Sequence, residues 1–231
     1  RAIELNGDDT LIGVAITDGE QQIMLFSNEG KAIRFAETDV RSMGRSAKGV
    51  RGMRVTIAAS QVEETEENDV DVEDEDNSDS VVISRIVSLV VVPETGEVLC
   101  ASEHGYGKRT PVDDFPTKKR GGKGVIALKT SERNGELIGA VSIDASKELM
   151  LISDGGTLVR TRASEVAQTG RNAQGVRLIR LSNDELLVGV VSVDAVEDEE
   201  LEGIDVVENT VVEAITSEEV SSEPKDDTTE E

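Results

Sequence analysis

Three loops of this sequence combine basic residues with glycines, and that combination suits the binding of phosphate groups. The loops run from Arg45 to Gly49, from Lys118 to Gly124 and from Arg171 to Gly175. Glycine lets backbone N–H groups approach a phosphate closely, while arginine and lysine supply positive charge. One such loop alone is better interpreted as a solvated turn, but three equivalent loops favour binding. We predict contacts from Arg45, Lys48, Arg51, Lys118, Lys119, Arg120, Gly121, Gly122, Lys123, Gly124, Arg171 and Arg177.

The three loops belong to three copies of one repeat, which align without gaps from Leu11, Ile86 and Leu137. Six columns are identical in all copies over 45 positions, and this coincidence makes the repeat the strongest signal in the sequence. These columns are Ser27/Ser102/Ser153, Gly30/Gly105/Gly156, Arg34/Arg109/Arg160, Arg45/Arg120/Arg171, Gly49/Gly124/Gly175 and Val50/Val125/Val176. A further column is always basic and contains Arg54, Lys129 and Arg180.

The spacing of the copies predicts the organisation of the chain. The copies begin 75 and then 51 residues apart, and an acidic segment lengthens the first interval, so the underlying unit is about 50 residues. A fourth copy begins at Leu187 and stops after one strand, which we expect a neighbouring unit to receive. The predicted divisions are a blade at 1–59, an acidic insertion at 60–80, a blade at 81–132, a blade with a closing strand at 133–193, and an acidic tail at 194–231.

The pattern inside each copy is that of β structure. The apolar runs Gln22–Phe26, Glu97–Ala101 and Glu148–Ile152 have the length of strands and no helical period. Each is followed by three residues that end at a shared glycine, which predicts a hairpin turn with glycine in the left-handed region. A second strand, the basic loop and a strand such as Val50–Val55 follow. We therefore predict an all-β fold, a β-pinwheel or propeller-like array of four-stranded blades.

The charge is segregated along the chain. The net charge of −24 arises from residues 60–80, with 11 acidic and no basic residues, and from residues 194–231, with 16 acidic residues and one basic residue. We expect both segments to be disordered, because they contain too few apolar residues to fold alone. The rest of the chain contains 21 acidic and 23 basic residues. The acidity of the whole chain therefore does not exclude a nucleic-acid partner.

The aromatic content favours duplex DNA as that partner. Proteins that bind single strands stack bases on aromatic side chains, at about 1–3 kcal/mol per base. This chain has no Trp, one Tyr and three Phe. Repeated phosphate contacts along a basic track would bend a duplex without reading its sequence. The Arg34/Arg109/Arg160 column lies inside a strand, where a structural role and a DNA contact both remain open.

No residues of the sequence form a catalytic or metal-binding pattern. His104 falls in a hairpin turn, and Asp113-Asp114 is typical of a turn. Cys100 falls in a strand, where a buried, inert thiol is expected. Tyr106, the one tyrosine, aligns with Lys31 and Thr157 and is not interpreted as a nucleophile. We expect no cofactor in this chain.

The lone cysteine and the lack of long apolar runs predict a reducing, non-membrane environment. One cysteine cannot form an internal disulfide. No apolar run approaches the roughly 18 residues that span a bilayer. The first residues are not a signal peptide and lack an initiator Met, so we expect a part of a longer cytoplasmic protein.

Four segments resemble the later blades of the carboxy-terminal domains of bacterial DNA gyrase A proteins. They are LKTSERNGELIGAV, EHGYGKRTPVDDFPTK, LISDGGTLVRTR and GRNAQGVRLIRL, and the similarity covers residues 3–193. The resemblance implies a β-pinwheel that exchanges strands between blades and wraps double-stranded DNA for negative supercoiling. It also implies an acidic tail and a bacterial, chromosome-associated type II topoisomerase. In that enzyme, gyrase A and gyrase B form an A2B2 complex, and ATP and Mg act on other domains.

The segment Lys118–Gly124 resembles the seven-residue box of this family, Gln-Arg-Arg-Gly-Gly-Lys-Gly. It matches at its last five positions, but it lies in a late blade. It can therefore be the functional box or a degenerate copy with a supporting role. Two alternatives for the chain remain: the carboxy-terminal domain of the corresponding topoisomerase IV protein, and a propeller-like platform whose basic loops bind an acidic protein.

Overall fold

The computed structural model describes residues 3–5, 7, 9–56, 84–93, 95–182 and 184–195. The acidic insertion predicted at 60–80 lies outside the described residues, as does the predicted tail from residue 196 onward. The chain divides into two units, residues 1–195 and 196–231, and the described fold belongs to the first. The blade boundaries predicted from the repeat stay predictions.

Three β-hairpins form the framework, and they confirm the all-β fold class. Apolar strands of five to seven residues pair across short turns that end at Gly30, Gly105 and Gly156, whose φ angles are +76°, +74° and +87°. Glycine adopts this left-handed backbone without a Cβ clash. The hairpins pair β1 (Gln22–Ser27) with β2 (Lys31–Ala36), β4 (Glu97–Ser102) with β5 (Tyr106–Pro111), and β8 (Lys147–Ser153) with β9 (Leu158–Arg162).

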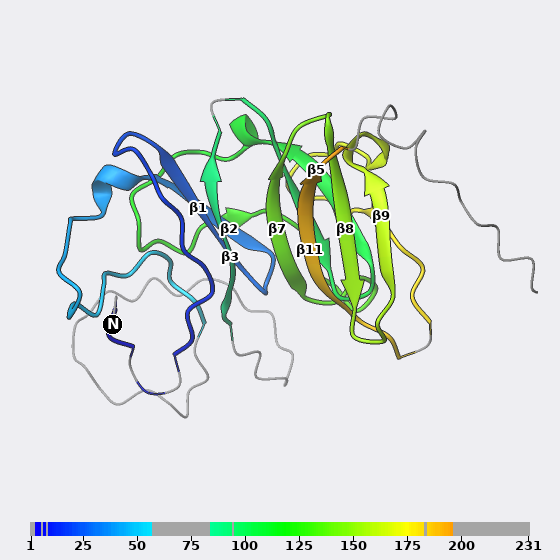
Figure 1. Ribbon diagram of the computed structural model, residues 1–231, viewed down its shortest axis with the longest axis horizontal. Coiled ribbons are helices and arrows are strands. Elements are labelled where there is room, and N and C mark those ends of the chain that lie inside the picture. The colour runs from blue at the N-terminus through cyan, green and yellow to red at the C-terminus, as the bar shows by residue number, and fades with distance from the viewer. Residues whose placement is uncertain are drawn as a thin grey trace, which may run out of the picture. The chain divides into compact units, whose positions relative to one another are not determined.

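Each hairpin is extended by strands that come from the next copy of the repeat. On one edge, β3 (Ile86–Val92), β7 (Leu137–Ile143) and β11 (Leu187–Asp194) pair with β1, β4 and β8. On the other edge, β6 (Val125–Ile126) pairs with β2, and β10 (Val176–Arg177) pairs with β5. The sheet orders are β3-β1-β2-β6, β10-β5-β4-β7 and β11-β8-β9 (Figure 1). Neighbouring copies are therefore joined by exchanged strands, and β11 is the strand of the incomplete fourth copy.

Two of the three hydrophobic cores among the described residues combine buried side chains of neighbouring copies. In the first core, Phe26 of the first copy meets Phe115 of the second, with ring centroids 6.4 Å apart and an interplanar angle of 77°. In the second core, Leu99 of the second copy packs with Leu149 and Val166 of the third. In Figure 1, β11 lies between β7 and β8, beside this core. The burial that stabilises each sheet therefore depends on its neighbour.

The predicted strand Val50–Val55 is wrong, and the start of the first copy also forms no strand. The structure assigns no strand to residues 50–55 or 11–17. The equivalent segments of later copies become strands because they pair with the preceding hairpin. In the first copy the described residues include no such hairpin. Val14 and Ile16 are accordingly 87% and 97% exposed.

The second shared glycine column lies where one copy meets the hairpin of another. Gly49, Gly124 and Gly175 have φ angles of +87°, +80° and +85°. A Cβ atom on Gly175 would come within 2.6 Å of the Gly107 carbonyl oxygen, whereas one on Gly49 would meet no atom within 4 Å. The two glycines therefore share one backbone conformation and differ in their surroundings.

This pair allows the exchanged contact to be tested by substitution. Gly49→Ala should lower the free energy of unfolding by about 1–2 kcal/mol, the cost of a left-handed alanine. Gly175→Ala should cost a further ~1–3 kcal/mol, because its Cβ displaces the backbone of β5. Urea denaturation of both variants measures the difference. Equal losses would show that the contact with Gly107 does not constrain the loop.

Candidate nucleic-acid interface

The structure places the basic loops of the second and third copies along the edges of the preceding hairpins, whereas the loop of the first copy joins no hairpin edge among the described residues. Most of the charged residues predicted to bind phosphate are exposed: Arg45, Lys48, Arg51, Lys118, Lys119, Lys123 and Arg177. Arg120 and Arg171 are half-buried. Within Lys118–Gly124, Gly121 and Gly124 adopt φ angles of +82° and +80°, and Gly122 is exposed. Two glycines of this loop therefore adopt the left-handed backbone conformation that glycine permits.

The basic loop of the second copy lies along β2 and against residues 51–54 of the first. The Lys118 N–H donates to the Arg34 carbonyl oxygen at 2.8 Å, and the Gly121 N–H donates to that of Gly52 at 2.6 Å. The Arg54 N–H donates in return to the Gly122 carbonyl oxygen at 2.9 Å. These bonds place the basic loop of the second copy next to the segment of the first copy that contains Arg51 and Arg54.

The basic loop of the third copy is attached to the second in the same way. The Thr169 N–H donates to the Arg109 carbonyl oxygen at 2.9 Å, and the Lys129 N–H donates to that of Ala173 at 3.2 Å. The side-chain amide of Asn134 donates to the Gln174 carbonyl oxygen at 3.1 Å. Backbone hydrogen bonds therefore fix the basic loops relative to the neighbouring copies.

The shared arginine of the loops helps to make this attachment. Arg120 donates from Nε to the Asp39 carbonyl oxygen and from Nη1 to that of Arg51, each at 2.9 Å. Arg171 donates from Nη1 to the Ile126 carbonyl oxygen at 3.2 Å. A guanidinium carries five N–H groups, so each arginine keeps donors for a phosphate. These two residues both hold the loop and charge it.

The Arg34/Arg109/Arg160 column is structural where a following copy is packed against it. Arg34 Nη1 donates to the carbonyl oxygens of Val112 and Phe115, at 2.9 and 3.2 Å. These carbonyls belong to the first residue of a 3₁₀ turn of the second copy, η3 (Val112–Asp114), and to the residue after it. This turn confirms the one predicted at Asp113-Asp114. In the same way, Arg109 Nε donates to the Val166 carbonyl oxygen at 2.7 Å. Its Nη1 forms an ion pair with the Glu97 carboxylate, also at 2.7 Å.

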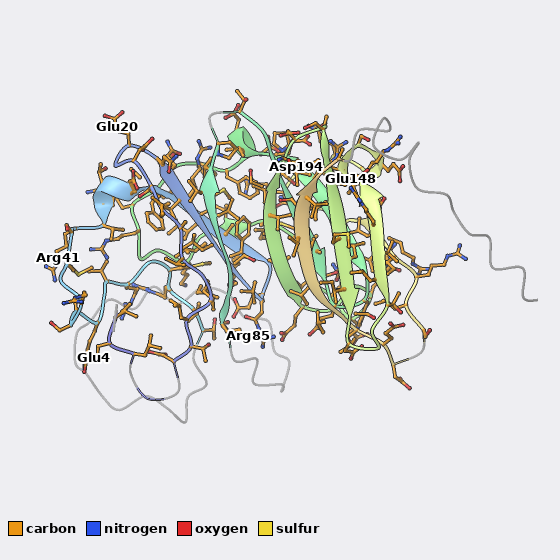
Figure 2. All side chains as sticks on the ribbon, in the orientation of Figure 1. Glu4, Glu20, Arg41, Arg85, Glu148 and Asp194 are labelled. Carbon is orange, nitrogen blue, oxygen red and sulfur yellow. The ribbon has the colours of Figure 1, made fainter. Side chains whose placement is uncertain are left out.

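Arg160 occupies the same column without this role. It contacts Glu148 and donates to the Asp194 carbonyl oxygen at 3.3 Å, both within its own sheet. Figure 2 shows Glu148 and Asp194 near the same end of this sheet. The Arg160 side chain is 42% exposed, against 15% for Arg109.

The different surroundings of Arg109 and Arg160 predict that replacement by methionine destabilises the protein more at Arg109 than at Arg160. Arg109→Met should lower the free energy of unfolding by about 2–4 kcal/mol, because it leaves the shielded Glu97 carboxylate without its cation. Arg160→Met should cost less than about 1 kcal/mol, as for an exposed ion pair. Urea denaturation checks both values. A small loss at Arg109 together with weakened DNA binding would assign the column to DNA instead.

A buried lysine forms hydrogen bonds with the third basic loop from the protein interior. Lys108 of β5 is 0% exposed, and its Nζ donates to the carbonyl oxygens of Gly170 and Arg171, each at 2.6 Å. Burial lowers the pKa of Lys108 from its ordinary 10.5 to about 8. Cys100, opposite it on β4, is buried as predicted, and burial raises the pKa of its thiol from 9.0 to about 12. A neutral amine still has two N–H groups for the two carbonyls.

Lys108 should make stability depend on pH. Between pH 8 and 10.5 the unfolded chain holds a proton at this lysine that the folded chain releases, so the free energy of unfolding should rise with pH. Lys108→Met should remove this rise. Both proteins should carry Cys100→Ala, because the raised thiol pKa produces the opposite slope above pH 9. Denaturation across this range checks the difference, and parallel curves would contradict the assignment.

Three positively charged residues near the loops were missed by the sequence prediction. Lys108 gave a usable signal, since Ile33 and Val159 fill its column with apolar side chains. Arg180 lies in the repeat column that is always basic. Arg133 lies outside the aligned repeat positions, so the repeat gave no signal for it. Within the described part of the chain, no cluster of His, Cys, Asp or Glu could hold a metal ion, and no helix is long and apolar enough to cross a membrane.

The fold and the interface together define a class of protein. It is an all-β repeat protein whose copies exchange strands and whose basic loops lie on neighbouring hairpins. The family model described as "DNA gyrase C-terminal domain, beta-propeller" matches residues 21–69, 96–144 and 147–194, which is more than half of the chain. The chain belongs to this DNA gyrase C-terminal domain family, and the resemblance inferred from the repeat is confirmed.

Individual relatives agree with the family. The DNA gyrase A protein of Haemophilus influenzae is 49% identical over 207 residues, which are 87% of this chain and 23% of the relative. The DNA gyrase A protein of Pseudomonas aeruginosa is 50% identical over 190 residues, which are 82% and 18% of the two chains. This chain thus spans less than a quarter of the length of these curated relatives.

Solved structures share the fold. A DNA gyrase A C-terminal domain matches with a TM-score of 0.67 and 26% identity, over 83% of this chain and 57% of that one. The C-terminal domain of a DNA topoisomerase IV matches with a TM-score of 0.68 at 20% identity, over 84% and 53%. At that identity, the second likeness concerns the fold alone.

Proposed function

We propose that this chain binds and wraps duplex DNA as the carboxy-terminal module of a bacterial DNA gyrase A protein, and so supports negative supercoiling. One observation carries the proposal: backbone hydrogen bonds fix the basic loops of the second and third copies to the copy that precedes each of them. Phosphate contacts repeated along such a surface can hold a bent duplex without reading its bases.

The aromatic side chains support recognition of the DNA backbone over recognition of bases. All four are described, and their exposed fractions are 0% for Phe26, 3% for Phe35, 1% for Phe115 and 7% for Tyr106. Phe26, Phe35 and Phe115 belong to hydrophobic cores. The chain therefore presents no aromatic platform on which the bases of a single strand could stack.

The remaining parts of the proposal concern the parent enzyme. Its relatives are DNA gyrase A proteins, and we propose a parent that works with the rest of gyrase A and with gyrase B in the bacterial cytoplasm. ATP and Mg would act on other domains. Within this chain, Lys118–Gly124 would contact phosphates, with Arg120 also anchoring the loop to the first copy.

The salt dependence of duplex affinity tests this proposal. The full chain, measured by fluorescence anisotropy of a labelled duplex, should bind with an affinity that falls steeply with salt. Lys118→Gln and Lys123→Gln remove exposed ammonium groups that have no side-chain bond in the described structure. Each should flatten the log–log slope by about 0.9, the value for one phosphate contact.

Lys147→Gln is the matched control. It also removes one positive charge, but its ammonium pairs with Asp194 and lies outside the basic loops. The slope of this variant should equal that of the unaltered chain. Slopes unchanged by Lys118→Gln and Lys123→Gln would place the DNA track elsewhere. No duplex binding at low salt would reject wrapping and favour the protein-interaction alternative.

A further inference from the structure

A cavity of about 510 Å³ lies at the junction of the second and third copies, next to the turn of the β4–β5 hairpin. His104 and Tyr106 of the second copy form part of its wall. Three arginines also line it: Arg133 from the segment between the second and third copies, and Arg177 and Arg180 from the third copy. We call these five residues the arginine pocket.

Tyr106 holds two of the arginines in place. Two arginines stack on its ring. The guanidinium carbon of Arg133 lies 4.8 Å from the ring centroid, and the guanidinium carbon of Arg177 lies 5.4 Å from it. Arg177 Nη2 also donates to the phenol oxygen at 2.9 Å. The ring is 7% exposed, so burial fixes it. A guanidinium stacked on a ring keeps N–H groups at its edge for other acceptors.

The described lining of the pocket has three arginines against two carboxylates, which leaves it with a net positive charge. None of the ion pairs within the described ranges involves Arg133, Arg177 or Arg180. Two carboxylates also line the cavity, those of Asp184 and Glu185. Glu185 accepts from the Ser153 hydroxyl and, at 3.0 Å, from the Ser182 N–H, so its carboxylate is held by neutral donors and forms no ion pair with the three arginines within the described ranges.

We propose that the arginine pocket binds phosphate oxygens. Guanidinium groups match phosphates in charge and in the spacing of their donors. If the chain wraps DNA, the backbone of the duplex supplies the phosphate, and this part rests on the proposed function. The first junction has no equivalent, because Lys31 replaces Tyr106 and Ile126 replaces Arg177 in the repeat columns. The two junctions would therefore hold DNA unequally.

Tyr106 gives the pocket its own spectroscopic reporter. It is the one tyrosine of the chain, so labelling tyrosine with carbon-13 at Cζ yields a single NMR signal. Titration of the full chain with tripolyphosphate, or with a short duplex, should shift this signal in a saturable way. Sodium chloride at equal ionic strength should not. The pKa of Tyr106, lowered first by the hydrogen bond from Arg177 and then by Arg133, should rise when bound phosphate offsets their charge.

One substitution separates binding from folding. Arg180→Gln leaves both guanidiniums on the ring and should weaken tripolyphosphate binding about tenfold, as expected for the loss of charged hydrogen bonds. Lys129→Gln changes the same repeat column at the first junction, and it should leave the affinity unchanged. Equal weakening by both variants would overturn the pocket as the binding site.

The two ligands distinguish the sources of phosphate. If both ligands shift the Tyr106 signal, and Arg180→Gln weakens the binding of both, the result supports the DNA backbone as the source of the phosphate. If only tripolyphosphate shifts the signal, the result supports a free phosphate compound as the ligand. If anisotropy shows that the duplex binds while neither ligand shifts Tyr106, the pocket is rejected and the proposed function stands. If no duplex binds while tripolyphosphate shifts Tyr106, the proposed function fails and the phosphate pocket stands.

Discussion

The fold depends on one contact: each copy of the repeat places segments of its own chain on the hairpin of the copy before it. A long strand joins one edge of that hairpin, and a two-residue strand joins the other. Between these two strands, an arginine of the hairpin binds the carbonyls of a turn in the next copy. Because two of the hydrophobic cores also lie between copies, a single copy could not bury all of its own apolar surface.

The same contact explains how charge is arranged for function. The loop that carries the basic residues is also the segment that crosses to the preceding hairpin. In the second and third copies its backbone is bonded at several points, and Lys108 also donates to carbonyls of the third loop from the interior. The charges are therefore presented on a fixed backbone, which reduces the entropy lost when phosphates bind. The repeat places this arrangement at intervals along the protein, as wrapping requires.

The sequence allowed the hairpins, their glycine turns and the repeat to be predicted, because each follows from local pattern. Exchange was expected for the single strand of the fourth copy, which pairs with β8, and was otherwise implied only by the family resemblance. Periodicity did not show it for the other strands, since an apolar segment does not reveal which hairpin it will join. The column Val40/Phe115/Val166 illustrates this point: its members are similar, yet they are 39%, 1% and 4% exposed. The arginine pocket was missed for the same reason, since Arg133 meets Tyr106 and Arg177 through packing of two copies.

The central claim is that basic loops on neighbouring copies act together on one duplex, and DNA bending tests it most directly. A duplex labelled at both ends with a fluorescence donor and acceptor reports its end-to-end distance when the full chain binds at low salt. The account predicts a shorter distance, and so higher transfer efficiency, that returns to the free value as salt releases the DNA. Saturated binding without any change in transfer would contradict it, because the loops would then hold the duplex straight.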